Sequence, residues 1–328
     1  MPELPEVQAH AERLEDDFAG ATLSAFRPLA FTALKTFRPD PADVVGEALR
    51  SVRRRGKHLL LDFPSATFVI HLMQGGRLVG DEKQSLKPRG GIARWTFEDG
   101  RALLLTEAGK ERKAGVWVLA GEVLAQPPLD DLGPEATDVD AAAMVELMHA
   151  HPMRLHGFLR DQRILAGLGR RLANEVCHAA RLSPFASTGK LDADDAAGVV
   201  EAIETCVAES LAYERGRDDM SKSKDRPGAV HGRAGEACPR CGDEIRSVTY
   251  TSYRVDYCAT CQTGGRLLAD RGMSRLLKAD WPRTLAELEE RKARARQAIP
   301  APPPSPTPAP ATPDSSKPSR TGKKPRNR

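Results

Sequence analysis

Short hydrophobic runs, broken by Gly and Pro, occupy most of the first 120 positions after an initial segment, residues 5–18, for which we expect a helix. The runs are rich in Val, Leu, Ile and aromatic residues, which favour strands. We expect strands at residues 51–52, 58–63, 67–72, 92–97, 102–106 and 116–119. Several short strands at this spacing predict a β-sandwich or barrel.

The pattern changes to helical periodicity between about residues 141 and 211, where Ala, Leu and Val recur every three or four positions. A linker near residues 126–134 precedes this region, and a polar, Gly-containing loop at 214–236 follows it. Beyond the loop we expect a β-hairpin at 245–257 and a last short helix at 285–298. The chain from Pro300 onward is rich in Pro, Ser, Thr and Ala and then basic, so it cannot form a core and is expected to be disordered.

Length and composition narrow the class of protein. The 328 residues predict two domains and a tail, and 40% of them are hydrophobic, which is enough for real cores. No run approaches 18 apolar residues, so we expect no membrane span. The N-terminus lacks a positive segment followed by an apolar one, which predicts a cytoplasmic protein without a secretory signal.

Basic residues are clustered although the net charge is only +4. Clusters occur at residues 53–57, 110–113 and 170–171 and in the last dozen residues. Groups of Lys and Arg suit a phosphate backbone, while any one such cluster is equally typical of a solvated surface. The distribution therefore favours a nucleic-acid partner more than the net charge does.

The six cysteines fall into two groups. Cys177 and Cys206 stand alone in helical segments, as small core residues do. The others form two Cys-x-x-Cys pairs separated by sixteen residues, a spacing that predicts one structural zinc site: Cys238, Cys241, Cys258 and Cys261. Four thiolates leave no open position for water, so we expect the metal to hold the hairpin rather than to perform chemistry.

The sequence Met1-Pro2-Glu3-Leu4-Pro5-Glu6 contains candidate catalytic groups. A small second residue normally permits removal of Met1, which would leave Pro2 with a secondary amine whose pKa is near neutrality. Such an amine attacks an aldehyde carbon and forms an iminium. Glu3 is a candidate acid and base beside it, and Glu6 lies three residues further along. The alternative is an ordinary helix start, in which Pro followed by Glu is common.

Two glycines, Gly167 and Gly169, lie between expected helices in the segment Arg160–Arg171. Glycine allows backbone amides to approach a phosphate at the start of the next helix. A plain turn between two helices explains the same pair.

Six motifs occur in one order along the chain, and together they resemble the pattern of a known family. They are Met-Pro-Glu-Leu-Pro-Glu-Val at residues 1–7, Arg55-Gly56-Lys57, His71-Leu72 with Gly75-Gly76-Arg77-Leu78, Leu132-Gly133-Pro134-Glu135, Asp161-Gln162-Arg163 with Ala166-Gly167-Leu168-Gly169, and the cysteine hairpin. With these motifs, roughly residues 2–278 resemble the formamidopyrimidine-DNA glycosylase / endonuclease VIII family.

The resemblance implies a base-excision repair enzyme, a DNA glycosylase with AP lyase activity on damaged, by expectation oxidised, bases. The damaged nucleotide of double-stranded DNA would be flipped into a pocket between two domains. Pro2 would attack the anomeric carbon and Glu3 would protonate the sugar oxygen, with Glu6 supporting the site. Lys57 would contact a phosphate. The Pro2 iminium would then allow strand cleavage by elimination, with no cofactor beyond the structural Zn²⁺.

The resemblance also implies an α+β fold in several parts. We expect an N-terminal catalytic β-sandwich with a flanking helix at residues 2–125, a helix–two-turn–helix DNA-binding domain at 135–225, a zinc-finger hairpin at 230–265 and a disordered basic tail at 299–328. A monomer is implied, without membrane association and, in a bacterium, associated with the nucleoid.

Departures from the family pattern fall on residues expected to contact DNA. Gln74 stands where the family carries Met in its intercalating loop, and the segment 110–115, with Arg112 and Lys113, lacks the family's aromatic wedge. A wedge offsets the cost of unstacking, so we expect altered opposite-base discrimination. Arg170 replaces the family's phosphate-binding Asn.

The hairpin departs as well. Tyr253 occupies the position of the family's Arg, and Arg254 is displaced by one residue, which in a strand places it on the opposite face. Two alternatives therefore stay open: a non-catalytic, zinc-containing protein that binds abasic or distorted DNA, and a zinc-ribbon protein of unrelated role, such as an RNA-binding or assembly factor.

Overall fold

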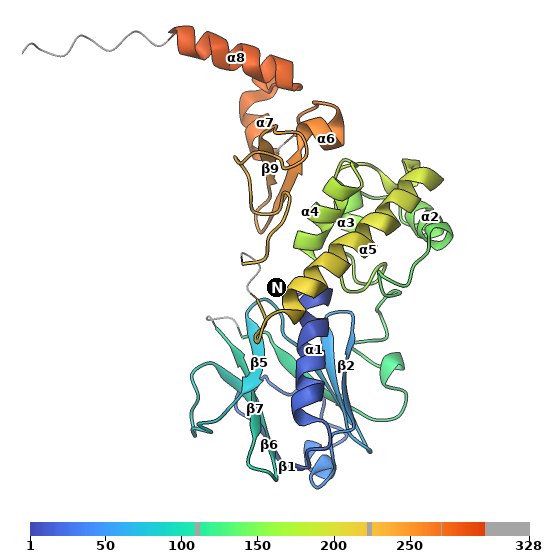
Figure 1. The fold of residues 1–328 in the computed structure, drawn as a ribbon, viewed down its shortest axis with the longest axis vertical. Coiled ribbons are helices and arrows are strands. Elements are labelled where there is room, and N and C mark those ends of the chain that lie inside the picture. The colour runs from blue at the N-terminus through green and yellow to red at the C-terminus, as the bar shows by residue number, and fades with distance from the viewer. Residues whose placement is uncertain (109–111, 222–224, 270, 299–328) are drawn as a thin grey trace, which may run out of the picture.

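The computed structural model describes residues 1–108, 112–221, 225–269 and 271–298 (Figure 1). The expected disorder of 299–328 lies outside these residues. Strands, a helical region and a small hairpin succeed one another along the chain, and the N-terminus lies where the three parts meet (Figure 1). The fold is of the mixed α+β class, as predicted.

Two four-stranded antiparallel sheets form the N-terminal part. The first has the order β2 (Ser51–Arg55), β3 (His58–Asp62), β4 (Thr67–His71) and β8 (Gly115–Leu119). The second has the order β1 (Leu23–Pro28), β6 (Gly91–Phe97), β7 (Ala102–Glu107) and β5 (Gly76–Gly80). The predicted β-sandwich is thus confirmed, and β1 and β5 are strands that the prediction missed.

Alternation along β3 explains how the first sheet is buried on both faces. Leu59 and Leu61 face the second sheet, whereas Leu60 faces the other way, toward Val69 and Leu129. Successive side chains of a strand point to opposite faces, so a continuous apolar run marks a strand covered on both sides.

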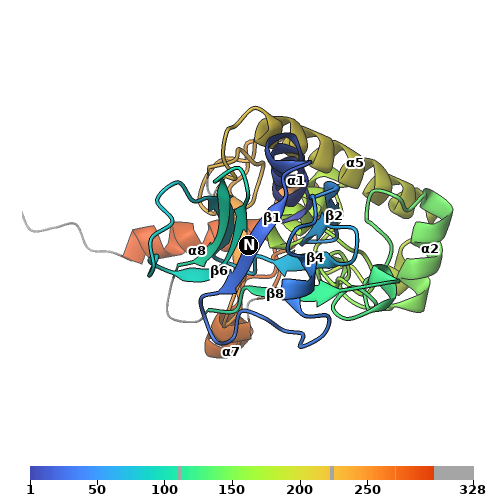
Figure 2. The same cartoon turned by 90° about the horizontal axis from the view of Figure 1, so that it is seen from below.

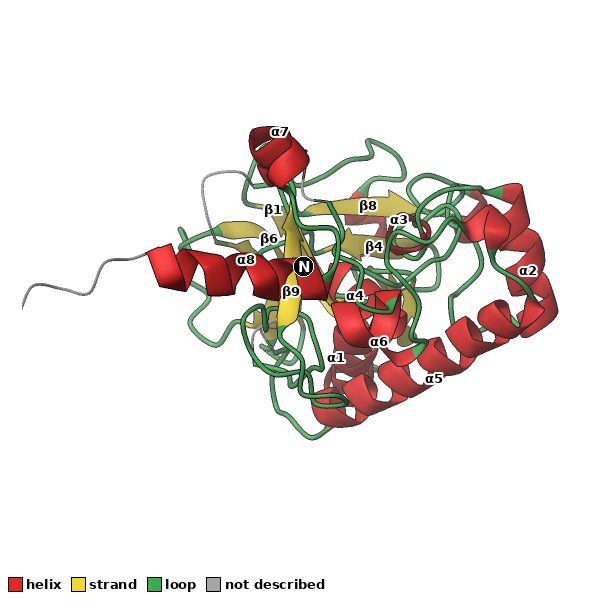
Figure 3. Cartoon of the chain, turned by 90° about the horizontal axis from the view of Figure 1, so that it is seen from above, coloured by secondary structure: helices red, strands yellow, loops and turns green. Residues whose placement is uncertain are grey.

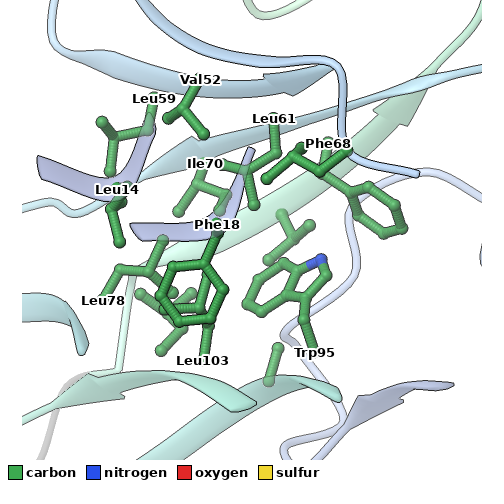
Figure 4. Packing of buried hydrophobic residues seen from close by; sticks show 14 of the residues in the cluster. Leu14, Phe18, Val52, Leu59, Leu61, Phe68, Ile70, Leu78, Trp95 and Leu103 are labelled. Atoms are coloured by element: carbon green, nitrogen blue, oxygen red, sulfur yellow. The ribbon is translucent and has the colours of Figure 1, made fainter. Parts of the chain in front are cut away.

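Helix α1 (Leu4–Phe18) covers one side of the sandwich and runs beside β2 (Figures 1 and 2). It buries Val7, Ala11, Leu14 and Phe18, which share one helical face because they are spaced by three or four residues. Figure 4 shows Leu14 and Phe18 pointing into the same cluster as Phe68 and Trp95. The helix thereby fixes the chain's first residues relative to both sheets.

The helical region contains α2 (Ala141–Ala150), α3 (Leu155–Phe158), α4 (Arg170–Ala179) and α5 (Ala193–Arg215). Along the described chain, one short 3₁₀ turn lies in this region, Thr188–Lys190, and others lie outside it at Pro41–Val44, Val123–Ala125 and Lys278–Asp280. Asp140 caps α2 by accepting from the Ala143 N–H at 2.8 Å. Cys177 and Cys206 are buried in this region's core, as predicted. Figure 3 shows α5 running past both α1 and α4, which it contacts.

The last part is a hairpin of β9 (Ile245–Thr249) and β10 (Arg254–Cys258), followed by α6 (Ala259–Thr263), α7 (Arg271–Leu277) and α8 (Leu285–Ala298). The predicted hairpin and last helix are confirmed, and α7 was not predicted. Among the described residues no helix combines the length and apolarity needed to cross a membrane.

Candidate active site

The Glu3 carboxylate is bound to the first turn of α4. It accepts hydrogen bonds from the backbone N–H groups of Gly169 at 3.1 Å, Arg171 at 2.9 Å and Leu172 at 3.0 Å. These amides have no partner inside the helix, and the helix N-terminus favours negative charge. Glu3 is only 4% exposed. The contact therefore fixes one acidic group, adjacent to Pro2, in a single orientation.

Gly167 and Gly169 allow this close approach. A Cβ at residue 169 would lie 2.3 Å from Glu3 Oε1, and one at residue 167, where φ is +101°, would lie 2.8 Å from Leu4 Cδ1. The Gly167 carbonyl accepts from the Leu4 N–H at 3.0 Å. Both glycines thus hold the start of the chain against α4, and their contact with a DNA phosphate stays a prediction.

Glu6 forms a second buried contact beneath Glu3. Its Oε2 accepts from the Glu3 backbone N–H at 3.0 Å, and its Oε1 lies 2.9 Å from Nη1 of Arg226. Burial raises the pKa of the Glu6 carboxyl group, and the Arg226 charge opposes that rise. Arg226 is 4% exposed and comes from the polar loop that the sequence predicted.

Pro2 is buried, and Met1 precedes it at the wall of a cavity of about 370 Å³. This cavity is also lined by Glu3, His231, Arg170, Arg171, Tyr253, Arg254 and Asp256. Burial lowers the pKa of the Met1 α-ammonium group, and nearby Glu3 opposes the shift. The surroundings therefore favour a neutral amine at the start of the chain.

Lys57 lies in the tight turn between β2 and β3, where Gly56 adopts a φ of +55°. Glu135 anchors this turn: its Oε1 accepts from the Gly56 N–H at 2.6 Å and from Arg55 Nη1 at 2.8 Å, and its Oε2 from Arg54 Nη1 at 2.5 Å. The motif at residues 132–135 thus supports the turn that carries Lys57.

Lys57 is unusual for a lysine because the residue is only 5% exposed. Burial lowers the pKa of Lys57 to about 8, with Glu3 opposing the shift and Arg160 adding to it. The group is therefore still mostly charged at pH 7.

Three of the residues expected to contact DNA, Gln74, Arg112 and Lys113, lie on exposed loops. Gln74 is exposed beyond β4, next to Met73, whose φ of +52° and N–H bond to His71 Nδ1 at 3.0 Å shape the turn. Arg112 and Lys113 are exposed, and the Lys113 N–H donates to Glu107 at 2.6 Å. The preceding Lys110 and Glu111 of the expected wedge segment lie outside the described residues.

The tip of the hairpin packs on the helical region through aromatic rings. Tyr253 stacks on Tyr250 with centroids 4.6 Å apart and on His156 at 6.1 Å, and the Arg160 guanidinium lies 4.5 Å from its ring centre. Tyr253 is thus a packing residue, whereas the Arg254 side chain is 51% exposed.

Arg170 joins the two sides of the cavity. Its Nη1 donates to the Ser252 carbonyl at the hairpin tip, at 3.0 Å. Arg170 begins α4, whose first turn binds Glu3. The substitution at this family position therefore links the hairpin tip to the helix beside the candidate catalytic residues.

The four predicted metal ligands come together. Their Sγ atoms all lie within 4.8 Å of one another, with Cys241 and Cys258 3.4 Å apart and Cys238 and Cys261 3.9 Å apart. Tetrahedral zinc with Zn–S bonds of about 2.3 Å requires sulfur separations of about 3.8 Å. The donor set and its spacing fit a closed metal site.

Sequence reasoning missed four residues at the site: His156, Arg160, Arg226 and His231. The spacing of His156 and Arg160 by four residues places both on one side of a helical turn and was a usable signal. No periodicity marks Arg226 or His231, which lie in a polar loop, and only the folded chain brings Arg226 to Glu6 and His231 to the cavity.

Comparisons with known proteins agree with this geometry. Residues 1–116 match the model of the formamidopyrimidine-DNA glycosylase N-terminal domain. A formamidopyrimidine-DNA glycosylase of Bacillus cereus is 30% identical over 280 residues, which cover 80% of this chain and 99% of that protein. An uncharacterized formamidopyrimidine-DNA glycosylase-like protein of Mycobacterium tuberculosis is 40% identical over 149 residues, 45% of this chain and 94% of that protein.

Solved structures share the fold. The Lactococcus lactis enzyme non-covalently bound to DNA containing an AP site matches with a TM-score of 0.70 and 21% identity, over 80% of this chain and 99% of that one. MutM in complex with DNA containing carbocyclic 8-oxo-G matches with a TM-score of 0.71 and 20% identity, over 80% of this chain and all of that one. Because the Bacillus relative is matched over nearly its whole length, the chain belongs to the formamidopyrimidine-DNA glycosylase family.

Proposed function

We propose that this protein is a base-excision repair DNA glycosylase with AP lyase activity, and that the amine of Pro2 is its nucleophile. The observation that carries the proposal is the anchoring of Glu3 on α4, which holds the start of the chain at the wall of a cavity. Membership of a family of DNA glycosylases with AP lyase activity supports the same reaction.

The chemistry requires removal of Met1, which converts the amide nitrogen of Pro2 into a secondary amine. The amine attacks C1′ of the damaged nucleotide, and the glycosidic C–N bond breaks with its electron pair leaving on the base, which takes a proton from water. The Pro2 nitrogen releases its own proton to the Glu3 carboxylate. The deoxyribose ring then opens, O4′ receives a proton from Glu3, and C1′ and the Pro2 nitrogen form an iminium. Attack needs a neutral amine; burial lowers the pKa of the neighbouring Met1 α-ammonium group, and we expect the same surroundings to favour a neutral amine at Pro2.

The iminium makes the C2′ protons acidic. When one of these protons passes to the Glu3 carboxylate, the electron pair of the broken C2′–H bond forms a C2′–C3′ double bond. The 3′ C–O bond breaks at the same time, and the phosphate leaves. Water then hydrolyses the iminium and returns the free amine. Glu6, held by Arg226, supports the position of Glu3 through the Glu3 backbone N–H.

The proposed substrate is damaged double-stranded DNA. Lys57 offers a largely charged ammonium to a phosphate at neutral pH. Further proposed DNA contacts are Gln74, Arg112, Lys113, Gly167, Gly169, Arg170 and Arg254. Zinc is the proposed metal of Cys238, Cys241, Cys258 and Cys261, where it would stabilise the hairpin without taking part in bond cleavage.

Borohydride trapping tests the nucleophile. Borohydride reduces the iminium to a stable adduct, and we expect an adduct on duplexes with an abasic site, 8-oxoguanine or an oxidised pyrimidine, whichever the enzyme accepts. Pro2→Gly should lose excision by on the order of 10³-fold or more while still binding abasic duplex. Pro5→Ala, in the first turn of α1, is the matched control and should keep the adduct.

Two outcomes contradict the proposal. Normal excision by Pro2→Gly would exclude Pro2 as the nucleophile. Specific binding to abasic duplex with no adduct, in protein whose mass shows that Met1 is absent, would favour a non-catalytic DNA-binding relative. The departures at Gln74, Arg170 and Tyr253 are the observations that give this second function weight.

A further inference from the structure

Helix α4 is held at both ends by functional parts of the protein. Its first turn binds Glu3, and its last turn carries His178, which is 3% exposed. The Nε2 atom of His178 lies 3.3 Å from Sγ of Cys238, one of the four clustered cysteines. A single helix of ten residues, about 15 Å long, thus joins the proposed metal site to the candidate catalytic carboxylate.

Two further contacts attach the cysteine cluster to the same end of α4. Arg240, which lies between the first two cysteines, donates from Nη1 to the His178 carbonyl at 2.8 Å and from Nη2 to the Ala179 carbonyl at 3.4 Å. The last carbonyls of a helix have no partner within it, and a cation there is favoured.

Gln262 forms the other attachment. It accepts from the Cys258 N–H at 2.8 Å and donates to the Leu182 carbonyl at 3.0 Å, just beyond α4. Both Cys-x-x-Cys pairs are therefore tied to the C-terminal end of this helix.

The direction of the His178 bond follows from the chemistry of a metal-bound cysteine. A thiolate that binds zinc has no proton, so it only accepts hydrogen bonds. Nε2 of His178 must then carry the hydrogen and donate it to Cys238. Hydrogen bonds from outside the ligand set orient the ligands and commonly change metal affinity by about 10- to 100-fold.

We propose that His178 supports the zinc site by donating a hydrogen bond to Cys238. This bond couples metal occupancy to the position of α4 and hence of Glu3. The inference rests on the proposed binding of zinc by the four cysteines. It gives the metal a positioning role at the active site in addition to its role in the hairpin.

Zinc affinity is the first measurement. The purified full-length protein is titrated with a chromogenic chelator that competes for zinc, and dissociation constants are compared among variants. His178→Leu, which cannot donate, should bind zinc about 10- to 100-fold more weakly. His178→Gln keeps an N–H donor and should recover most of the affinity. His149→Leu is the matched control, because His149 Nε2 lies 3.1 Å from a backbone carbonyl, that of Leu191, in the same helical region.

Backbone hydrogen exchange of α4 is the second measurement. Faster exchange at Arg171 and Leu172 in His178→Leu and in chelator-treated wild-type protein, with no change in His149→Leu, would support the coupling. Equal exchange in all samples would overturn it. Zinc affinity within twofold of wild type in His178→Leu would exclude the proposed support of Cys238 by His178. Wild-type protein without one zinc per chain would contradict the metal assignment itself.

Discussion

The proposed catalytic end and the proposed DNA-reading end of this protein are built differently. Glu3, Glu6 and Lys57 are 4%, 3% and 5% exposed, and each is fixed by backbone amides, a buried arginine or an anchored turn. Gln74 and Arg112, expected to read DNA, are exposed on loops. Groups proposed to move protons need fixed geometry before the substrate arrives, whereas exposed side chains can reach the duplex directly. Lys57 is the exception, because it is a proposed phosphate contact that is buried.

This contrast bears on the departures from the family pattern. Gln74 replaces a family residue at an exposed position, where a change of side chain leaves the core intact, whereas Arg170 and Tyr253 replace family residues at half-buried positions. At the catalytic end a change would leave a buried group without its partner, which is costly. Substitutions should therefore affect chemistry and stability at one end, and affinity or base preference at the other.

The largest expected effect follows from Glu3→Gln. The amide has only one acceptor oxygen for the three N–H donors of α4, and it cannot transfer a proton as an acid does. Single-turnover cleavage of an abasic duplex should slow by about 10²- to 10⁴-fold. Glu12→Gln, on the same helix but paired with exposed Arg215, should cleave normally. Equal cleavage rates for Glu3→Gln and Glu12→Gln would contradict the proposed role of Glu3.

Arg226→Met is expected to give the largest loss of stability. It leaves the buried Glu6 carboxylate without its ionic partner and should lower the free energy of unfolding by about 3–5 kcal/mol, measured with denaturant. The double variant Glu6→Gln with Arg226→Met should recover part of the loss, because no buried charge remains unpaired. Arg215→Met, in a half-exposed pair with Glu12, should cost no more than about 1 kcal/mol.

The sequence predicted the fold best where burial is continuous. Strands β3, β4, β6 and β7 are buried along most of their length and appear as apolar runs. Strands β1 and β5 lie at the two edges of their sheet, with a neighbour on one side only. Their outer residues are exposed, so the hydrophobic pattern that marks a strand is weak in both.

The candidate site divides in a similar way. Pro2, Glu3 and the four cysteines could be found because their chemistry depends on short local motifs. Arg226 could not, because its partner Glu6 is 220 residues earlier in the chain and nothing in a polar loop distinguishes one arginine from another. Tyr253 was recognised as a departure, but its stack with His156 exists only after the hairpin packs on the helical region.

A smaller effect is expected from pH acting on Lys57. Its pKa of about 8 in the free protein means that the charge is lost as pH rises through 8, whereas a bound phosphate favours the charged form. Affinity for abasic duplex at constant salt should therefore fall above pH 8, by at most about tenfold per pH unit. Lys57→Arg stays charged and should show no such fall between pH 7 and 9. The same slope in both proteins would mean that another group titrates.

The smallest effect is expected at the hairpin tip, where Tyr253→Leu removes an aromatic stack and a cation–π contact with Arg160. Such contacts are each worth about 0.5–1.5 kcal/mol, so stability should fall by roughly 1–2 kcal/mol. Tyr253→Phe keeps the ring and should match wild type. A double-mutant cycle with Arg160→Met isolates the cation–π part. If Tyr253→Leu lowered the free energy of unfolding more than Arg226→Met, the contrast between the two ends would fail. Packing at the hairpin tip would then matter as much to stability as the buried ion pair does.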